Sequence, residues 1–282
     1  MIITANIDLL SKYKRINHLK YIWFQVYNAS IYNTARMKNI NYSLLVLFLF
    51  LSNPIQATEE FKKFQWIDKV KTPKIIITNN YGDVRLKYGG NENKVEYIGV
   101  VQNLDENNPL KIVHLTKDHV FSIEVTVNDK AVKNSRVDIT VFIPVGKEVT
   151  VITDKGLINA TGVKANLNLK SDSGTIKVDK IKGTISTENN TGSTFITLKS
   201  NFLVDAEQSF KSIYGNISLW MRKDAHHEVT LSTSADIISD FSMKVKKNRH
   251  QEPNKTAKIL LNKAVSKLVL FSKRGVIAVR EN

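Results

Sequence analysis

From residue 72 onward, apolar and polar residues alternate along the chain with a period of two. β-Branched residues are frequent in the clearest runs, which span 74–78, 83–87, 94–98, 121–127 and 136–143. Alternation turns successive side chains to opposite faces, so each run predicts a strand with one face buried and the other in water. No segment after residue 57 has a helical period, and 201–211 is the least regular stretch. The pattern predicts one all-β domain over 72–282, preceded by a linker over 58–71.

The middle of this domain contains an internal repeat marked by glycine. Gly156, Gly174 and Gly192 follow one another at a spacing of 18 residues. An acidic or amide residue stands two positions before each of them, namely Asp154, Asp172 and Asn190. We expect each glycine to supply the positive φ of a tight turn and each Asx side chain to bond its own backbone there. These residues are therefore predicted to be structural turn residues.

The apolar positions behind the first two glycines superpose. Ile158 corresponds to Ile176, Ala160 to Val178, and Leu167 to Ile185, whereas the match weakens after Gly192. Gly215 begins another copy after a longer insertion, and the segments around Gly82 and Gly275 are more distant copies. An 18-residue unit cannot bury its apolar side alone, but stacked units can, with Ile158 and Ile176 about 4.8 Å apart. The repeat predicts a β-solenoid or β-helix-like stack; the alternative is a β-sandwich with evenly spaced hairpins.

The start of the chain has the features of a secretory signal peptide. A short basic segment begins at Met37, an apolar run of eight residues covers 44–51, and Ala57 ends a small-residue cleavage motif. The run is well under the roughly 20 residues that span a bilayer. We therefore assign 37–57 to a signal peptide and 1–36 to a misassigned upstream extension. The alternative is an uncleaved membrane anchor with a long cytoplasmic lead.

Composition narrows the chemistry. The chain has no cysteine, which excludes disulfides, thiolate metal sites and a cysteine nucleophile. Its net charge is +15, and the part after residue 57 keeps 35 basic against 25 acidic residues. A basic exported domain is biased toward anionic envelope or host polysaccharide or lipid, and export excludes nucleic acid. After signal cleavage the chain would not be an integral membrane protein. The oligomeric state is left open.

The densest basic stretch is a candidate anion-binding site. It contains Lys244, Lys246, Lys247 and Arg249. Ammonium and guanidinium groups bind phosphate and sulfate oxygens by charge-assisted hydrogen bonds. The alternative is a solvated loop, and alternating lysines are also typical of an edge strand protected from aggregation.

Two groups of residues were considered as metal ligands. In a stack, Asp154 and Asp172 would lie one above the other and could hold calcium, although capping of the turns explains them better. The adjacent pair His226-His227, followed by Glu228, would point to opposite faces of a strand and is better explained by an exposed turn. His114 and His119 flank a predicted hairpin turn. We therefore predict no resident cofactor and no metal.

No motif for a nucleophile, a phosphate-binding loop or a dinucleotide site is present, which predicts a protein that is not an enzyme. The alternative is a polysaccharide-active β-helix enzyme, with Trp220 or Tyr214 as an aromatic platform and carboxylates brought together from distant turns.

One resemblance extends this interpretation. The repeats over 156–162 and 167–178, with the strand and proline over 137–144, resemble the bacterial "putative adhesin" family of exported domains of unknown function. The resemblance covers about 73–279. It implies a β-solenoid-like fold at the cell envelope without catalytic residues. We therefore expect an exported protein, periplasmic or on the cell surface, that binds or scaffolds through a solenoid face.

Overall fold

The computed structural model describes residues 62–102, 111–126, 136–199 and 207–282. The predicted upstream extension and signal peptide lie outside the described residues. The described residues form strands joined by turns and contain no helix. The predicted all-β class is confirmed.

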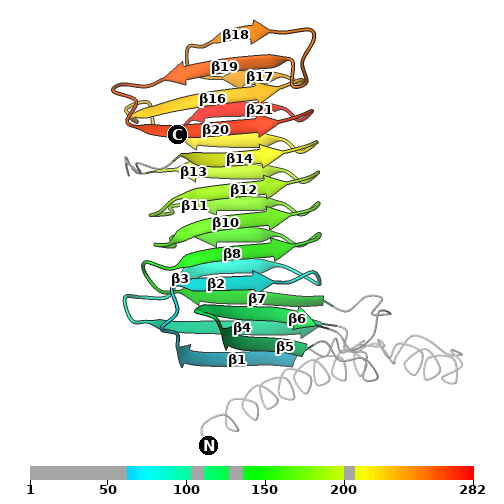
Figure 1. The fold of residues 1–282 in the computed structure, drawn as a ribbon, viewed down its shortest axis with the longest axis vertical. Helices are drawn as coiled ribbons and strands as arrows, with labels where there is room; N and C mark the ends of the chain where they lie inside the picture. Colours follow the sequence, from blue (N-terminus) through cyan, green and yellow to red (C-terminus); the bar gives the residue numbers. More distant parts are fainter. Residues whose placement is uncertain (1–61, 103–110, 127–135, 200–206) are drawn as a thin grey trace, which may run out of the picture. The chain divides into compact units, whose positions relative to one another are not determined.

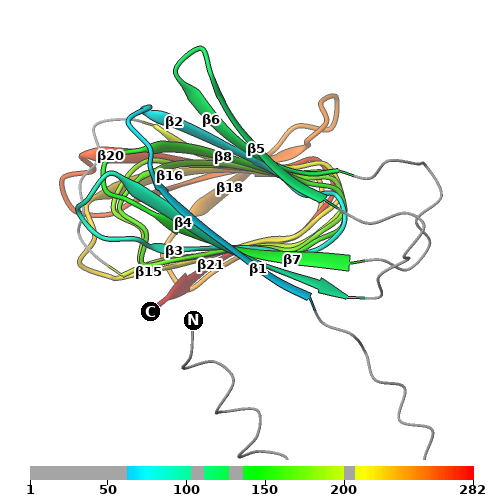
Figure 2. The ribbon, with the colours of Figure 1, turned by 90° about the horizontal axis from the view of Figure 1, so that it is seen from below.

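The strands form two sheets whose inner faces pack together (Figures 1 and 2). The first sheet has 10 described strands, in the spatial order β1 (Lys62–Lys69), β4 (Lys94–Gln102), β7 (Arg136–Ile143), β3 (Val84–Tyr88), β9 (Ile158–Thr161), β11 (Ile176–Asp179), β13 (Thr194–Leu198), β15 (Ile217–Met221), β21 (Ile277–Glu281) and β17 (Ile237–Ser239). The second has 11, in the order β18 (Lys244–Lys247), β19 (Lys255–Leu260), β16 (His227–Thr233), β20 (Ser266–Ser272), β14 (Gln208–Ser212), β12 (Ile185–Asn189), β10 (Asn166–Ser171), β8 (Glu148–Thr153), β2 (Lys74–Thr78), β6 (Val120–Thr126) and β5 (Lys111–Lys117).

In the middle of the stack the chain climbs one rung at a time, with one strand in each sheet. β8 and β9 form one rung, β10 and β11 the next, and β12 and β13 the third, all paired in parallel with their neighbours (Figure 1). Alternate side chains of every strand point between the sheets, where aliphatic residues of successive rungs stack into one continuous core. This is the β-solenoid-like architecture that the repeat predicts.

The register predicted from the repeat is confirmed. Ile158 pairs with Ile176, Ala160 with Val178, and Leu167 with Ile185. The third rung keeps the same register, because Thr194 takes the place of Ile176 and is fully buried. The weak match after Gly192 thus reflects one polar residue at a core position.

Both ends of the stack are closed by antiparallel strands. β4 and then β1 cover the end of the first sheet, while β5 ends the second sheet beside β6. At the opposite end, β19 and β18 extend the second sheet beyond β16. The predicted linker over 58–71 is therefore wrong in its described part, since residues 62–69 form β1 and pair along their whole length with β4.

Chain order and spatial order differ near the C-terminus. The final rung, β20 and β21, lies between the rung of β14 and β15 and the rung of β16 and β17 (Figure 1). The last strands of the chain are therefore internal, and the strands that precede them form the outer end.

Candidate functional site

The predicted turn glycines form a column along one corner of the stack. Six glycines take equivalent positions in successive rungs: Gly82, Gly156, Gly174, Gly192, Gly215 and Gly275. A Cβ added to any of them would lie 1.8–2.2 Å from a backbone carbonyl oxygen of the neighbouring rung. None of the six has a positive φ, so the expected left-handed turn is wrong. Glycine is required at this corner because the rungs approach too closely for a side chain.

A second column at this corner escaped the sequence analysis. Three residues before each glycine stands a buried Ser, Thr or Asn, in the order Asn79, Thr153, Ser171, Asn189, Ser212 and Ser272. Ser171, Asn189, Ser212 and Ser272 accept hydrogen bonds from the glycine amides of their own turns, at 2.8–3.0 Å. The signal was present as a pattern of Ser/Thr/Asn-x-x-Gly, one residue before the Asx positions.

Asp154, Asp172 and Asn190 lie at successive turns on the outside of the same corner. The Asn190 amide donates a hydrogen bond of 2.6 Å to Asp172 Oδ1. Backbone amides of each turn donate to carbonyls of the preceding turn, as Ser173 does to Asp154. These contacts tie one turn to the next.

The four residues of the predicted anion site, Lys244, Lys246, Lys247 and Arg249, lie together at the outer end of the second sheet and are called the basic edge below. The three lysines form most of β18, and Arg249 lies in the turn that follows it; all four are exposed. None of the four forms an ion pair with another described residue. Glu252, the acid of the following loop, pairs with Lys273 and Arg274 instead.

The basic edge continues onto β19. Lys244 lies directly opposite Lys258, and Lys247 lies opposite Lys255. Lys258 has a partner in Glu228, at 2.9 Å, and Lys255 contacts Asp236 and the Ala235 carbonyl. Like charges that face each other across strands reduce stability, so this end of the sheet concentrates positive charge at a cost to folding.

The histidine pair does not form an exposed turn, as we had expected. His227 begins β16 and is 2% exposed, whereas Glu228 points outward to Lys258. His227 Nδ1 is hydrogen-bonded to Ser266 Oγ. Burial, reinforced by the neighbouring His226, lowers the pKa of His227. This histidine is part of the packing between β16 and β20.

The other two histidines flank the predicted hairpin, but they do not face each other. β5 and β6 pair as a hairpin whose turn contains His119, while His114 lies opposite Ile123. The His114 ring stands 4.4 Å from the Trp66 ring, centroid to centroid, and its Nδ1 is 3.2 Å from the Tyr97 hydroxyl. With Phe121, these rings close the N-terminal end of the core. Among the described residues, no group of three His, Asp or Glu could hold a metal ion.

Trp220 and Tyr214 do not form a common platform. Trp220 lies on the outer face of the first sheet and stacks on Phe195, with ring centroids 6.2 Å apart. Tyr214 lies in the glycine corner, with the Arg274 guanidinium 5.8 Å from its ring.

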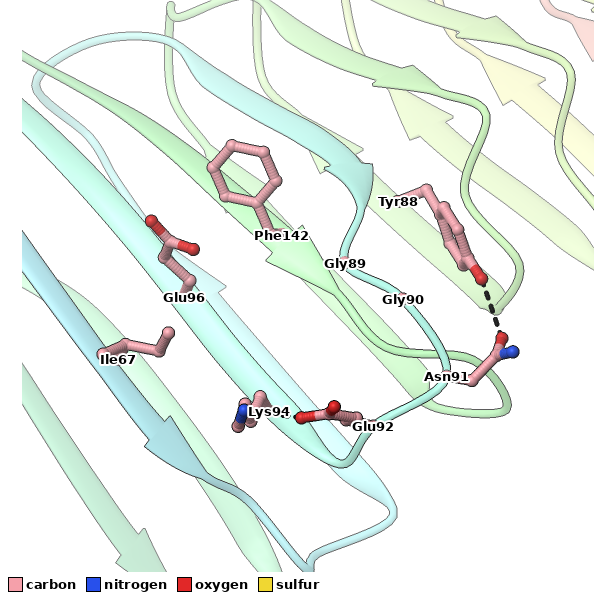
Figure 3. Close-up of a pocket in the computed structure, with 9 residues that line it drawn as sticks. All are labelled: Ile67, Tyr88, Gly89, Gly90, Asn91, Glu92, Lys94, Glu96 and Phe142. Atoms are coloured by element: carbon pink, nitrogen blue, oxygen red, sulfur yellow. Dashed lines mark hydrogen bonds and ion pairs between the residues drawn. The ribbon is translucent and has the colours of Figure 1, made fainter.

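A cleft of about 510 Å³ opens on the outer face of the first sheet near its N-terminal end, as Figure 3 shows. Three residues that are neighbours in the sheet register form its floor: Ile67 of β1, Glu96 of β4 and Phe142 of β7. Its wall is Tyr88 with the segment 89–92 that leads to β4. Lys94 pairs with Glu92 at the rim, and this hydrogen bond lowers the pKa of Glu92. The sequence analysis did not find this site.

Stacked parallel rungs with a glycine corner define a β-solenoid-like domain. The sequence matches the family described as Toastrack DUF4097 over residues 55–279. The chain belongs to this family, and the resemblance stated from the sequence is confirmed.

Solved structures show the same fold at low identity. A cell adhesion protein, described as putative, from Clostridium sporogenes ATCC 15579 is 14% identical, with a TM-score of 0.47, covering 79% of this chain and 100% of that one. A "putative adhesin" from Bacteroides fragilis NCTC 9343 is 12% identical, with a TM-score of 0.27, covering 78% and 97%. One from Parabacteroides merdae ATCC 43184 is 9% identical, with a TM-score of 0.30, covering 78% and 96%. Comparison with curated proteins found no match. Within the described residues, no helix has the length and apolar character to cross a membrane.

Proposed function

We propose that this chain is an exported, non-enzymatic envelope or surface protein that binds an anionic polysaccharide or lipid through its basic edge. The observation that carries the proposal is the group of exposed, unpaired cations formed by Lys244, Lys246 and Lys247 with Arg249. Membership of the family and the adhesion names of the similar structures support the binding role. The signal-peptide pattern over 37–57 supports export.

The spacing of the cations suits a repeating anion. Lys244 and Lys246 project from the same face of β18, about 6.8 Å apart along the strand. Lys258 extends the charge sideways onto β19. A polymer with regularly spaced phosphate, sulfate or carboxylate groups would relieve the repulsion between these lysines by binding to them.

The binding test compares two triple variants of equal charge. In the first, Lys244, Lys246 and Lys247 are replaced by Gln; in the second, the exposed Lys155, Lys182 and Lys87, which lie elsewhere, are replaced by Gln. The probes are heparin, polyglycerol phosphate and phosphatidylglycerol vesicles. We expect the first variant to bind at least one probe tenfold more weakly than wild type, with a shallower salt dependence, and the second to bind nearly as wild type. Equal losses in the two variants, or no binding by wild type, would refute the proposal.

Export is tested by N-terminal sequencing of the protein from fractionated cells. We expect the mature chain to start at Thr58, in the periplasmic or surface fraction. Recovery of a chain that begins at Met1 in the cytoplasmic fraction would show that the export hypothesis is wrong.

A further inference from the structure

We propose that the cleft on the first sheet is a second binding site, which takes an uncharged saccharide ring. It lies near the N-terminal end of the stack, among β1, β3, β4 and β7, whereas the basic edge lies beyond β16 at the other end. The proposal does not depend on the basic edge, and the two sites differ in chemistry.

The cleft has the size and composition of a small-molecule site. Its volume of about 510 Å³ falls within the range of roughly 300–1,000 Å³ that is common for such sites. The Phe142 ring lies in the floor between Glu96 and the wall, and the Tyr88 ring belongs to the wall (Figure 3). A sugar ring has an apolar face of C–H groups, which packs well on an aromatic ring, and an edge of hydroxyls that need polar partners.

The aromatic wall is held in place before any ligand arrives. The Tyr88 hydroxyl donates a hydrogen bond of 2.7 Å to Asn91 Oδ1. The Lys164 ammonium lies 4.5 Å from the centre of the same ring. With two such contacts the side chain is nevertheless 38% exposed. A fixed and partly exposed ring reduces the entropy lost on binding.

The polar groups favour a ligand that donates hydrogen bonds and carries no negative charge. Glu96 is oriented by Gln65, whose Nε2 donates to Oε1 at 2.9 Å, so the second carboxylate oxygen is free to accept a hydroxyl. The cleft has two carboxylates, Glu92 and Glu96, against the single ammonium of Lys94. An anionic polymer of the kind proposed for the basic edge would be repelled here.

Two glycines keep the wall low. Gly89 has the backbone of Phe142 within 3.0 Å of any added Cβ, and Gly90 adopts a φ of 99° with open space beside it. Backbone therefore borders the cleft where other residues would place side chains, and a ring can approach the Phe142 face from this side.

The test uses ligand-observed NMR and calorimetry on the whole chain. The probes are glucose, galactose, mannose, N-acetylglucosamine and the β-1,4-linked trimers of glucose and N-acetylglucosamine. We expect saturable binding of at least one probe by wild type. Tyr88→Ala is expected to weaken it at least tenfold, and Tyr88→Phe to weaken it less because the ring stays. Glu96→Gln, which keeps the shape of the side chain, is expected to weaken it several-fold.

Tyr214→Ala is the matched control. Tyr214 is also an exposed tyrosine beside a cation, but it lies in the glycine corner outside the cleft. We expect this variant to bind sugar as wild type does. The proposal is overturned if no probe saturates, if Tyr88→Ala binds normally, or if Tyr214→Ala loses as much affinity. Because anionic-polymer binding is measured with the lysine variants, each proposal can fail without the other.

Discussion

Single residues at the glycine corner decide how closely the rungs can stack. The added Cβ at Gly174 would lie 2.0 Å from the Gly156 carbonyl oxygen, well inside van der Waals contact. The buried hydroxyl or amide three positions earlier accepts the glycine N–H, so a polar group that would otherwise be orphaned in the core is paired. The corner therefore combines a steric requirement with a hydrogen-bonding one, and both repeat along the stack.

Replacing Gly174 by alanine should separate steric crowding from conformational strain. We expect Gly174→Ala to lower the free energy of unfolding by about 3 kcal/mol or more, because the rungs must move apart. Gly146→Ala is the comparison, since Gly146 has a φ of 78° but nothing within 4 Å of an added Cβ. It should cost about 1–2 kcal/mol. Urea unfolding followed by circular dichroism measures both; equal effects would contradict the steric explanation.

His227 should make stability depend on pH. Burial lowers the pKa of this histidine below its ordinary 6.5. The unfolded chain therefore takes up the proton at a higher pH than the folded chain does. The histidine's contribution is fully present above about pH 6.5 and is lost as the pH falls through the lowered pKa, by about 1.4 kcal/mol for each unit of lowering.

The measurement is the free energy of unfolding at several values between pH 8 and pH 5. We expect His227→Gln to flatten the fall seen in wild type, and the exposed His250→Gln to leave it unchanged. An equally steep fall in His227→Gln would show that other groups cause it.

Among the elements, β18 has an exposed edge that its lysines protect. It is the last strand of the second sheet, and its outer backbone groups have no strand to pair with among the described residues. We expect Lys244→Val with Lys246→Val to promote self-association, because an apolar, uncharged edge can pair with a second copy. Light scattering across a concentration series measures this.

The control places the same change on an internal strand. Lys267→Val with Lys211→Val alters exposed positions of β20 and β14, both of which have neighbours on each side. Equal association of this variant would mean that surface hydrophobicity, not the edge, is responsible.

The sequence predicts the elements best where they repeat. Alternation identified β2, β6 and β7, and the glycine spacing predicted the register of Ile158 on Ile176. β1 was missed because Lys62–Lys69 has no clean alternation and pairs antiparallel with a strand about 30 residues away. The cleft could not be predicted, since Ile67, Glu96 and Phe142 become neighbours only through the registers of three strands. The basic edge was visible because its cations are adjacent in sequence.

For the domain of stacked rungs, the chain path sets an order of assembly. β20 pairs with β14 on one side and with β16 on the other, so β16 cannot reach its final place as the outer rung until β20 is present. The pairing of Gln208 with Leu268 also joins residues far apart in sequence, and such contacts form slowly. The middle rungs, by contrast, pair residues only 18 positions apart.

The C-terminal end should therefore form after the middle of the stack. Trp220 reports on it, because its strand partner is Arg280 of the final rung. In a variant with Trp23 and Trp66 replaced by Phe, we expect refolding measured by Trp220 fluorescence to lag behind the far-ultraviolet circular dichroism of the sheets. Leu270→Ala, which weakens packing in the final rung, should speed the loss of the Trp220 signal during unfolding more than Leu169→Ala, which lies in a middle rung. Coincident fluorescence and dichroism traces, with equal effects of the two variants, would show that the stack folds as one unit despite its chain path.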